Sequence, residues 1–338
     1  MKLLEGNIAV EEVAPSLFKI TVPQPFYSPN HVYLIRDKQN MLIDSGYIES
    51  IRHLAASLNY LGLSFRKIDY LFYTHPHIDH ITGGFLIRRY ANVQTMGHYQ
   101  MDKDIPDYLA DQEIWAQDTA RLLKLAFRDK EIRSKRIHRS LENHKRFMRR
   151  FQNPAIGKVG DNFIHLDHHL KHGDVIETGQ FQFEVIETPG HSKWHLTPIE
   201  HKQKWIFTGD LIIGNLTAIY SQLDGDLIQY IRTMNHLKKF QEYRFFPAHG
   251  KEIKNPAKRI KTILKTLNIL EYGILRRLKE KPMGLLDLME SAMGTKVSSG
   301  ALFHTALAMT ESVLRKMIAE QKIYSKVYDD EYEEFFFS

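Results

Sequence analysis

Four side chains that can bind a metal ion lie within six residues of this chain. They are His75, His77, Asp79 and His80. Neutral imidazoles together with a carboxylate suit divalent cations such as zinc, which accept nitrogen and oxygen donors. A histidine-rich surface loop is the alternative, because the chain contains 18 histidines. If a metal binds, a metal-activated water is the economical nucleophile, since the chain has no cysteine and no recognisable serine or lysine nucleophile motif.

Strand-like runs precede this cluster and four further candidate positions. The apolar, aromatic run at residues 68–73 is typical of a buried strand and leads directly into the cluster. Comparable runs at 41–43, 181–186, 205–207 and 245–248 lead to Asp44, His191, Asp210 and His249. Glycines stand beside these positions, as expected where the backbone turns sharply. Five strand ends that converge on one rim would form a metal site on a sheet scaffold.

The order of these residues resembles that of the metallo-β-lactamase superfamily over about residues 8–255. The resemblance implies an α/β fold, an αββα sandwich. It implies that His75, His77 and His191 hold a first metal ion. It further implies that Asp79, His80 and His249 hold a second one and that Asp210 bridges the two. Asp44 would accept an imidazole N–H and fix the orientation of that ring.

This ligand set predicts hydrolysis. Two divalent ions about 3.5–4 Å apart share a water and lower its pKa towards 7, so that hydroxide exists at neutral pH. The hydroxide would attack a carbonyl carbon or a phosphorus atom. Asp79 is placed to orient the nucleophile or to take its proton, and Asp210 is the second residue to which we assign a catalytic role.

The identity of the metal is a separate question. The superfamily also includes iron proteins, and its flavin-dependent di-iron reductases typically carry a glutamate where this chain has His77. His77 therefore favours hydrolysis and zinc, although imidazole also suits iron and manganese. An iron-dependent oxidoreductase is the alternative from a different class.

Other histidines are expected to be structural or solvated. A second cluster, formed by His165, Asp167, His168, His169 and His172, precedes the turn signal Gly-Asp and predicts an exposed loop. His195 follows His191 by four residues, and either a supporting or a purely structural role is open. His138 and His144 lie among basic residues on a helical stretch and are expected to be solvated.

Length and composition indicate a two-part globular protein. We predict a catalytic domain at residues 1–255, with a helical insertion at about 103–158, and a small winged-helix-like domain at residues 256–338. No stretch approaches the roughly 20 apolar residues of a membrane span, and acidic residues interrupt any apolar stretch near the N-terminus. With no cysteine in the chain, a cytoplasmic location is the default expectation.

The insertion supplies the protein's excess positive charge. Residues 121–150 contain 12 lysines and arginines and three acidic residues, a balance of +9 against +6 for the whole chain. A basic lid that attracts a small anionic ester, thioester or lactone is our first hypothesis. A strand-binding surface of a metal-dependent endoribonuclease is the second hypothesis, and a solvated helix face is the alternative to both.

The C-terminal region predicts three helices followed by a hairpin. Its last helix, residues 301–321, carries few basic residues, and the hairpin after it is acidic. A nucleic-acid-binding face should be basic. The order resembles a winged helix, and we therefore expect this region to pack against the catalytic domain or to form a homodimer.

Overall fold

The computed structural model describes residues 2–4, 8–25, 28–105, 107–152, 163–214, 216–293, 301–328 and 331–338. Contacts divide the chain into two compact units. The first unit comprises Met1–Pro106, Asn162–Ala218 and Asn235–Arg259, and the second comprises Asp107–Asp161, Ile219–Met234 and Ile260–Ser338. The predicted site residues all fall in the first unit.

Two β-sheets form the centre of the first unit. The larger sheet has eight strands in chain order: β1 (Lys2–Leu4), β2 (Ile8–Ala14), β3 (Leu17–Val22), β4 (Asn30–Ile35), β5 (Met41–Ile43), β6 (Tyr70–Phe72), β7 (Gln94–His98) and β8 (His168–Leu170). The other sheet has the order β15-β12-β11-β10-β9, where β9 is Val175–Glu177, β10 Gln182–Glu187, β11 Leu196–Glu200, β12 Trp205–Gly209 and β15 Arg244–Pro247. A short hairpin of β13 (Ile212–Ile213) and β14 (Leu216–Thr217) follows β12.

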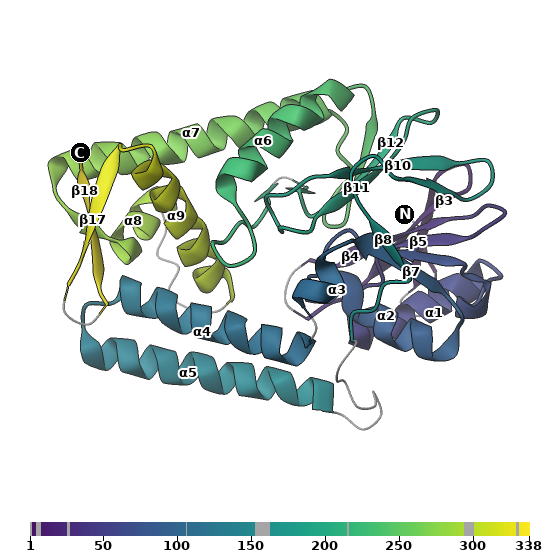
Figure 1. Ribbon diagram of the computed structural model, residues 1–338, viewed down its shortest axis with the longest axis horizontal. Helices are drawn as coiled ribbons and strands as arrows, with labels where there is room; N and C mark the ends of the chain where they lie inside the picture. Colours follow the sequence, from purple (N-terminus) through teal and green to yellow (C-terminus); the bar gives the residue numbers. More distant parts are fainter. Residues whose placement is uncertain are drawn as a thin grey trace. The chain divides into compact units, whose positions relative to one another are not determined.

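The hydrophobic core lies between the two sheets. Tyr33 from β4 contacts Phe207 from β12 with 5.3 Å between ring centroids, and Phe207 stacks on Phe246 from β15 at 5.2 Å. The strands of both sheets contribute their buried apolar residues to one cluster. Helices α1 (Ile51–Tyr60), α2 (Ile78–Tyr90) and α3 (Met101–Asp104) connect strands of the larger sheet (Figure 1), and α1 packs on β2 and β3. Two facing sheets with flanking helices confirm the predicted fold class.

The second unit is mainly helical. It contains α4 (Tyr108–Ala126), α5 (Lys130–Met148), most of α6 (Leu227–Leu237) and of α7 (Pro256–Glu280), α8 (Leu285–Met293) and α9 (Ala301–Ala319). A three-stranded sheet, β16-β18-β17, completes it, with β16 at Met283–Gly284, β17 at Ile323–Val327 and β18 at Glu333–Phe337. The three helices and the two hairpin strands predicted for the C-terminal region are present, and the last helix begins at the expected residue. Residues 329 and 330, where a hairpin turn is expected between these strands, lie outside the described residues, and the winged-helix assignment stays a prediction.

The insertion packs with the C-terminal region. Helices α4 and α5 run side by side (Figure 1), and α4 contacts α8 and α9. Arg121 of α4 donates two hydrogen bonds of 2.7 Å to Glu311 of α9. The ring of Phe127, the residue after α4, lies 6.3 Å from the ring of Phe303 in α9. The sequence-based division assigned residues 103–158 to the domain at 1–255, whereas contacts group residues 107–161 with 260–338. The apolar face of α4 explains this grouping, because its buried side chains find partners on the C-terminal helices.

Among the described residues, no helix is long and apolar enough to cross a membrane. The cytoplasmic location and the homodimer stay predictions.

Candidate metal centre

Each predicted site residue follows the end of a strand or opens the next helix. His75 and His77 lie in the loop between β6 and α2, and Asp79 and His80 lie in the first turn of α2. The other three candidate ligands, His191, Asp210 and His249, follow β10, β12 and β15. Strands β5 and β6 are parallel, as are β12 and β15, so that their carboxyl ends lie at the same edge of each sheet. The fold therefore brings all seven candidate ligands together, as the strand-end pattern predicts.

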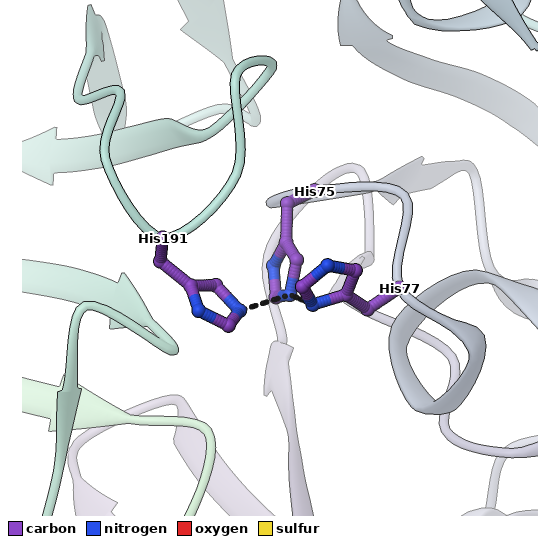
Figure 2. A group of neighbouring side chains, drawn as sticks. All are labelled: His75, His77 and His191. Carbon is purple, nitrogen blue, oxygen red and sulfur yellow. Dashed lines mark hydrogen bonds between the residues drawn. The ribbon is translucent and has the colours of Figure 1, made fainter. Parts of the chain in front are cut away.

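Three imidazole rings converge on one point. His75 Nε2 lies 3.0 Å from His77 Nδ1 and 3.2 Å from His191 Nε2. Figure 2 shows these nitrogens turned towards one another from two separate loops. Burial, followed by the neighbouring imidazoles, holds the pKa of His75 well below its ordinary value. His75 is therefore neutral at pH 7, which is the form that binds a metal.

A second group of candidate ligands contains a carboxylate. His249 Nε2 lies 3.1 Å from Asp79 Oδ2, and His80 Nε2 lies 3.7 Å from Asp79 Oδ1. Asp210 lies between the two groups. Its Oδ1 is 3.5 Å from His80 Nε2 and 3.4 Å from His249 Nε2, whereas its Oδ2 is 3.7 Å from His191 Nε2. The two oxygens of Asp210 thus face different groups, as a bridging carboxylate requires.

The buried polar atoms of this centre fit a divalent cation. His80 Nε2 and Asp210 Oδ1 are buried and have no hydrogen-bond partner within the described residues, a costly state that a cation would relieve. Burial opposes charge on both residues, yet the three carboxylates around His80 raise its pKa well above the ordinary value. Likewise, despite burial, His249 and His80 hold the pKa of Asp210 well below its usual range. The negative charge gathered here favours a bound cation.

The comparison with known families agrees with this centre. The sequence model of the metallo-β-lactamase superfamily matches residues 27–249, which include every candidate ligand. The chain belongs to the metallo-β-lactamase superfamily. The resemblance inferred from the ligand order is thereby confirmed for the superfamily.

Curated relatives match parts of the chain. A β-lactamase-like protein 2 homolog of Drosophila melanogaster is 28% identical over 167 residues, 49% of this chain and 56% of the relative. An atrochrysone carboxyl ACP thioesterase of Aspergillus aculeatus is 26% identical over 47% of this chain and 53% of its own. A hydroxyacylglutathione hydrolase of Bdellovibrio bacteriovorus is 44% identical over 73 residues, 22% of this chain and 28% of its own. The chain spans about half the length, or less, of these relatives.

Solved structures share the fold along the whole chain. A β-lactamase domain protein from Burkholderia ambifaria superposes with a TM-score of 0.76 at 16% identity, covering 100% of this chain and 95% of its own. A metallo-β-lactamase family protein from Thermus thermophilus gives a TM-score of 0.74 at 15% identity, with coverages of 97% and 100%. The helical second unit is therefore included in the shared fold.

Asp44 contacts a candidate ligand, His80, on the side of the ring that faces away from the other ligands. Its Oδ1 accepts the backbone N–H of Thr74 at 2.8 Å, and its Oδ2 lies 2.8 Å from His80 Nδ1. A hydrogen bond from Nδ1 leaves Nε2 of His80 as the atom that faces Asp79 and Asp210. This arrangement matches the predicted role of Asp44 as an acceptor for an imidazole.

We expect Asp44→Asn to lower metal affinity about 10–100-fold, the usual effect of removing such a supporting carboxylate. Asp44 has a positive φ of 62°, which asparagine also tolerates, so the backbone should be retained. Competition with a chromogenic chelator measures the affinity, and Glu177→Gln, an exposed carboxylate of the same unit, is the control. An unchanged affinity in Asp44→Asn would assign Asp44 a purely structural role.

His195 supports the first group of imidazoles. Its ring is fully buried, stacks on His75 at 5.1 Å, and accepts or donates through Nδ1 to Thr188 Oγ1 at 2.9 Å. A Cβ on Gly209, which has a φ of +47°, would lie 2.5 Å from His195 Nε2. Glycine is therefore required at position 209. The ring of His195 packs directly against a candidate ligand, and its role stays a prediction.

The second histidine cluster does not converge. His165, His168, His169 and His172 are exposed, and they contact separate partners, such as Asp167 for His165 and Asp102 for His169. The exposure agrees with the prediction, but His168 and His169 lie in β8 and not in a loop. β8 is an edge strand that pairs with β7, which leaves both imidazoles exposed although they belong to the sheet.

The two histidines of α5 differ. His138 is exposed, as expected. The expectation that His144 is solvated is wrong, because its side chain is only 15% exposed and lies 3.5 Å from Glu113 of α4. The packing of α5 on α4 covers that ring.

Several supporting residues have no sequence signal. Asn30 donates a side-chain hydrogen bond to the backbone carbonyl of Asp79, and His249 Nδ1 lies 3.1 Å from the carbonyl oxygen of Pro29. His31 Nε2 lies 2.7 Å from the carbonyl oxygen of Gly250. The contact of Asn30 joins β4 to α2 over 49 residues, and the contacts of His249 and His31 join the chain around the start of β4 to the loop after β15 over about 220 residues. Only spatial proximity, which these sequence spacings conceal, identifies the residues.

Proposed function

We propose that this protein is a dinuclear, metal-dependent hydrolase of a small anionic ester, thioester or lactone. The observation that carries the proposal is the position of Asp210, whose two oxygens face two separate groups of candidate ligands. The named activities of relatives, an ACP thioesterase and hydroxyacylglutathione hydrolases, support acyl transfer to water as the reaction class.

The ligand assignment follows the two groups. His75, His77 and His191 would hold one ion, and Asp79, His80 and His249 would hold the other, with Asp210 shared. We assign zinc to both positions because imidazole nitrogens dominate the donor set, and iron and manganese are the alternatives. Bound ions would supply the Lewis acidity that polarises an acyl oxygen and ionises a water near pH 7.

The residues of the chain would handle the proton and the orientation. Burial alone would raise the pKa of the Asp79 carboxyl, but His80 and His249 beside it hold that pKa below its ordinary value. Asp79 is therefore ionised at neutral pH and can accept the proton of the attacking water. The water oxygen bonds to the acyl carbon, the bond to the leaving oxygen or sulfur breaks, and the leaving group takes up the proton.

Metal analysis and substrate hydrolysis test this proposal together. The protein is freed of metal with a chelator and reloaded with zinc, manganese or iron in separate samples, and each sample is assayed on a panel of thioesters, esters and lactones. We expect two ions per chain and hydrolysis that returns on reloading. Redox activity confined to the iron sample would favour the oxidoreductase, and absence of hydrolysis with two bound ions would exclude the proposal for these substrates.

One observation favours an endoribonuclease as a second candidate. Helix α5 contains seven lysines and arginines against two acidic residues, and none of its residues is fully buried. Such a helix can attract a phosphate backbone. Cleavage of end-labelled single-stranded RNA by the metal-loaded protein, lost on Asp210→Ala and weakened by salt, is the expected result for this candidate, whereas intact RNA with both ions bound would exclude it.

A further inference from the structure

Three aromatic rings form a stack in the first unit. None of them belongs to a candidate ligand of the metal centre. The ring of His98, at the end of β7, stacks on Tyr99 with 4.6 Å between centroids and an interplanar angle of 28°. The indole of Trp194 lies 5.1 Å from the same His98 ring at 31°. These distances and angles are those of attractive aromatic pairs.

Strand register places this stack at the edge of the sheet that carries the ligands. In the parallel pair β6–β7, Phe72 is opposite Met96, and the N–H of Tyr73 donates to the carbonyl of Met96. His98 lies two residues beyond Met96, and Thr74, which immediately precedes His75, lies two residues beyond Phe72. Because β6 and β7 are parallel, both residues lie towards the same edge of the sheet.

Trp194 reaches the stack from a loop that also carries a ligand. The loop between β10 and β11 contains His191 and His195, both buried, whereas Lys193 is exposed and Trp194 is partly exposed. The carbonyl of Ser192 accepts the N–H of Gly190, and the Ser192 hydroxyl accepts the N–H of Trp194, which holds the loop in a tight turn. The loop thus fixes the metal ligand and the indole relative to each other.

The three rings of the stack differ in exposure. The middle ring, His98, is 4% exposed. Tyr99 is 38% exposed, but the ammonium of Lys103 lies over its ring, 5.9 Å from the centroid, whereas Trp194 is partly exposed. Exposed aromatic faces that rigid packing holds in place can bind a further flat ring at a low cost in conformational entropy. Tryptophan is highly buried on average, and a buried indole would stabilise this loop more than a partly exposed one. Stability alone therefore does not explain the exposure of Trp194.

We propose that the exposed side of the Trp194 indole is a specificity-determining surface that stacks on an aromatic ring in the acyl or leaving group of the substrate. This inference rests on the proposed hydrolase function and narrows its substrate class to aryl-bearing esters and thioesters. A purely structural role for Trp194 is the competing explanation.

A pair of matched substrates separates the two explanations. Phenylacetyl and cyclohexylacetyl thioesters have the same chain length and the same leaving group, but only the first has a flat ring. We expect Trp194→Ala to lower kcat/KM about tenfold for the phenyl substrate, which corresponds to loss of the stacking and contact area of one aromatic pair. The cyclohexyl substrate should change less than about twofold, and Trp194→Phe should retain most of the phenyl preference.

The control is Tyr60→Ala, which removes an exposed aromatic ring of α1 in the same unit. We expect Tyr60→Ala to leave both substrates unchanged. An equal loss for the two substrates in Trp194→Ala would show that the residue only stabilises the loop, and it would overturn the proposal.

Tryptophan fluorescence supplies a readout that does not depend on turnover. The chain has three tryptophans, and only Trp194 belongs to the stack. We expect phenylacetate to quench the emission of wild-type protein, with cyclohexylacetate quenching far less, and the difference to disappear in Trp194→Phe. If phenylacetate quenches the emission but neither thioester is hydrolysed, the stacking surface stands and the proposed reaction is wrong. If the two acids quench equally, the stacking surface is wrong.

Discussion

Replacement of Asp210 by alanine should abolish hydrolysis and reduce metal binding from two ions to one or none. Asp210 is 6% exposed, and its two oxygens lie near His80, His191 and His249. A metal ion contributes several kcal/mol of transition-state stabilisation, and each 1.36 kcal/mol corresponds to a factor of ten in rate. We therefore expect kcat/KM to fall by about 1,000-fold or more, measured on the best substrate from the acyl panel, with metal content measured on the same sample.

Two further variants make this result specific. Asp210→Asn retains the size of the side chain and removes its charge, so it should show the same direction of effect with less disturbance of the loop. Glu177→Ala removes an exposed carboxylate of β9 and should leave metal content and rate unchanged. Full activity and two ions per chain in Asp210→Ala would contradict the shared-ligand assignment and with it the proposed dinuclear centre.

The sequence indicates which residues are candidate ligands, and the structure brings them together, because their positions follow from local rules. A short apolar run ends, a glycine or a helix start follows, and a ligand-type side chain stands at the junction, as at Asp44, His75 and Asp210. The carboxyl ends of strands that run in the same direction lie at one edge of a sheet, so local predictions combine into a site. The aromatic stack was not predicted, because His98 and Trp194 meet only through the register of β7 and the turn of the 188–195 loop.

The grouping of the insertion could not be predicted from sequence for a different reason. Its amphipathic pattern predicts a buried face, but a pattern does not say which other helix covers that face. In the structure, Leu122 and Phe127 are buried and Arg121 pairs with Glu311, 190 residues later in the chain. Such pairs depend on tertiary packing, which composition and charge balance alone do not reveal.

The same packing predicts a large stability effect at Arg315. Its guanidinium donates two hydrogen bonds to Glu333 and two to Glu311, and both glutamates are 2% exposed. Arg315→Ala would leave Glu333 buried without this partner, and breaking a buried ion pair costs about 3–5 kcal/mol. Arg121 still donates to Glu311 in this variant. We therefore expect the free energy of unfolding to fall by the lower value, about 3 kcal/mol, as measured by urea unfolding followed by circular dichroism.

Arg277→Ala is the matched control for this loss. Arg277 and Glu280 form an arginine–glutamate pair of the same unit, but their side chains are 44% and 61% exposed. Exposed pairs of this kind contribute at most about 1 kcal/mol. An equal effect of the two arginine variants would show that the contacts of Arg315 add nothing beyond an ordinary surface pair.

The pH dependence of the Arg315→Ala loss provides an independent check. Burial opposes ionisation of Glu311, but Arg121 and then Arg315 hold its pKa below the ordinary value. A carboxyl with a lowered folded-state pKa stabilises the protein above its unfolded-state pKa, about 4.3, and this contribution disappears as the pH falls through the folded-state pKa. The bonds of Arg315 to Glu311 contribute part of the loss in Arg315→Ala. The difference in unfolding free energy between wild type and this variant should therefore be larger at pH 7 than at about pH 3.5. A difference that stays constant over this interval would mean that the lost contacts are not ionic, and that the packing of the arginine stem accounts for the loss.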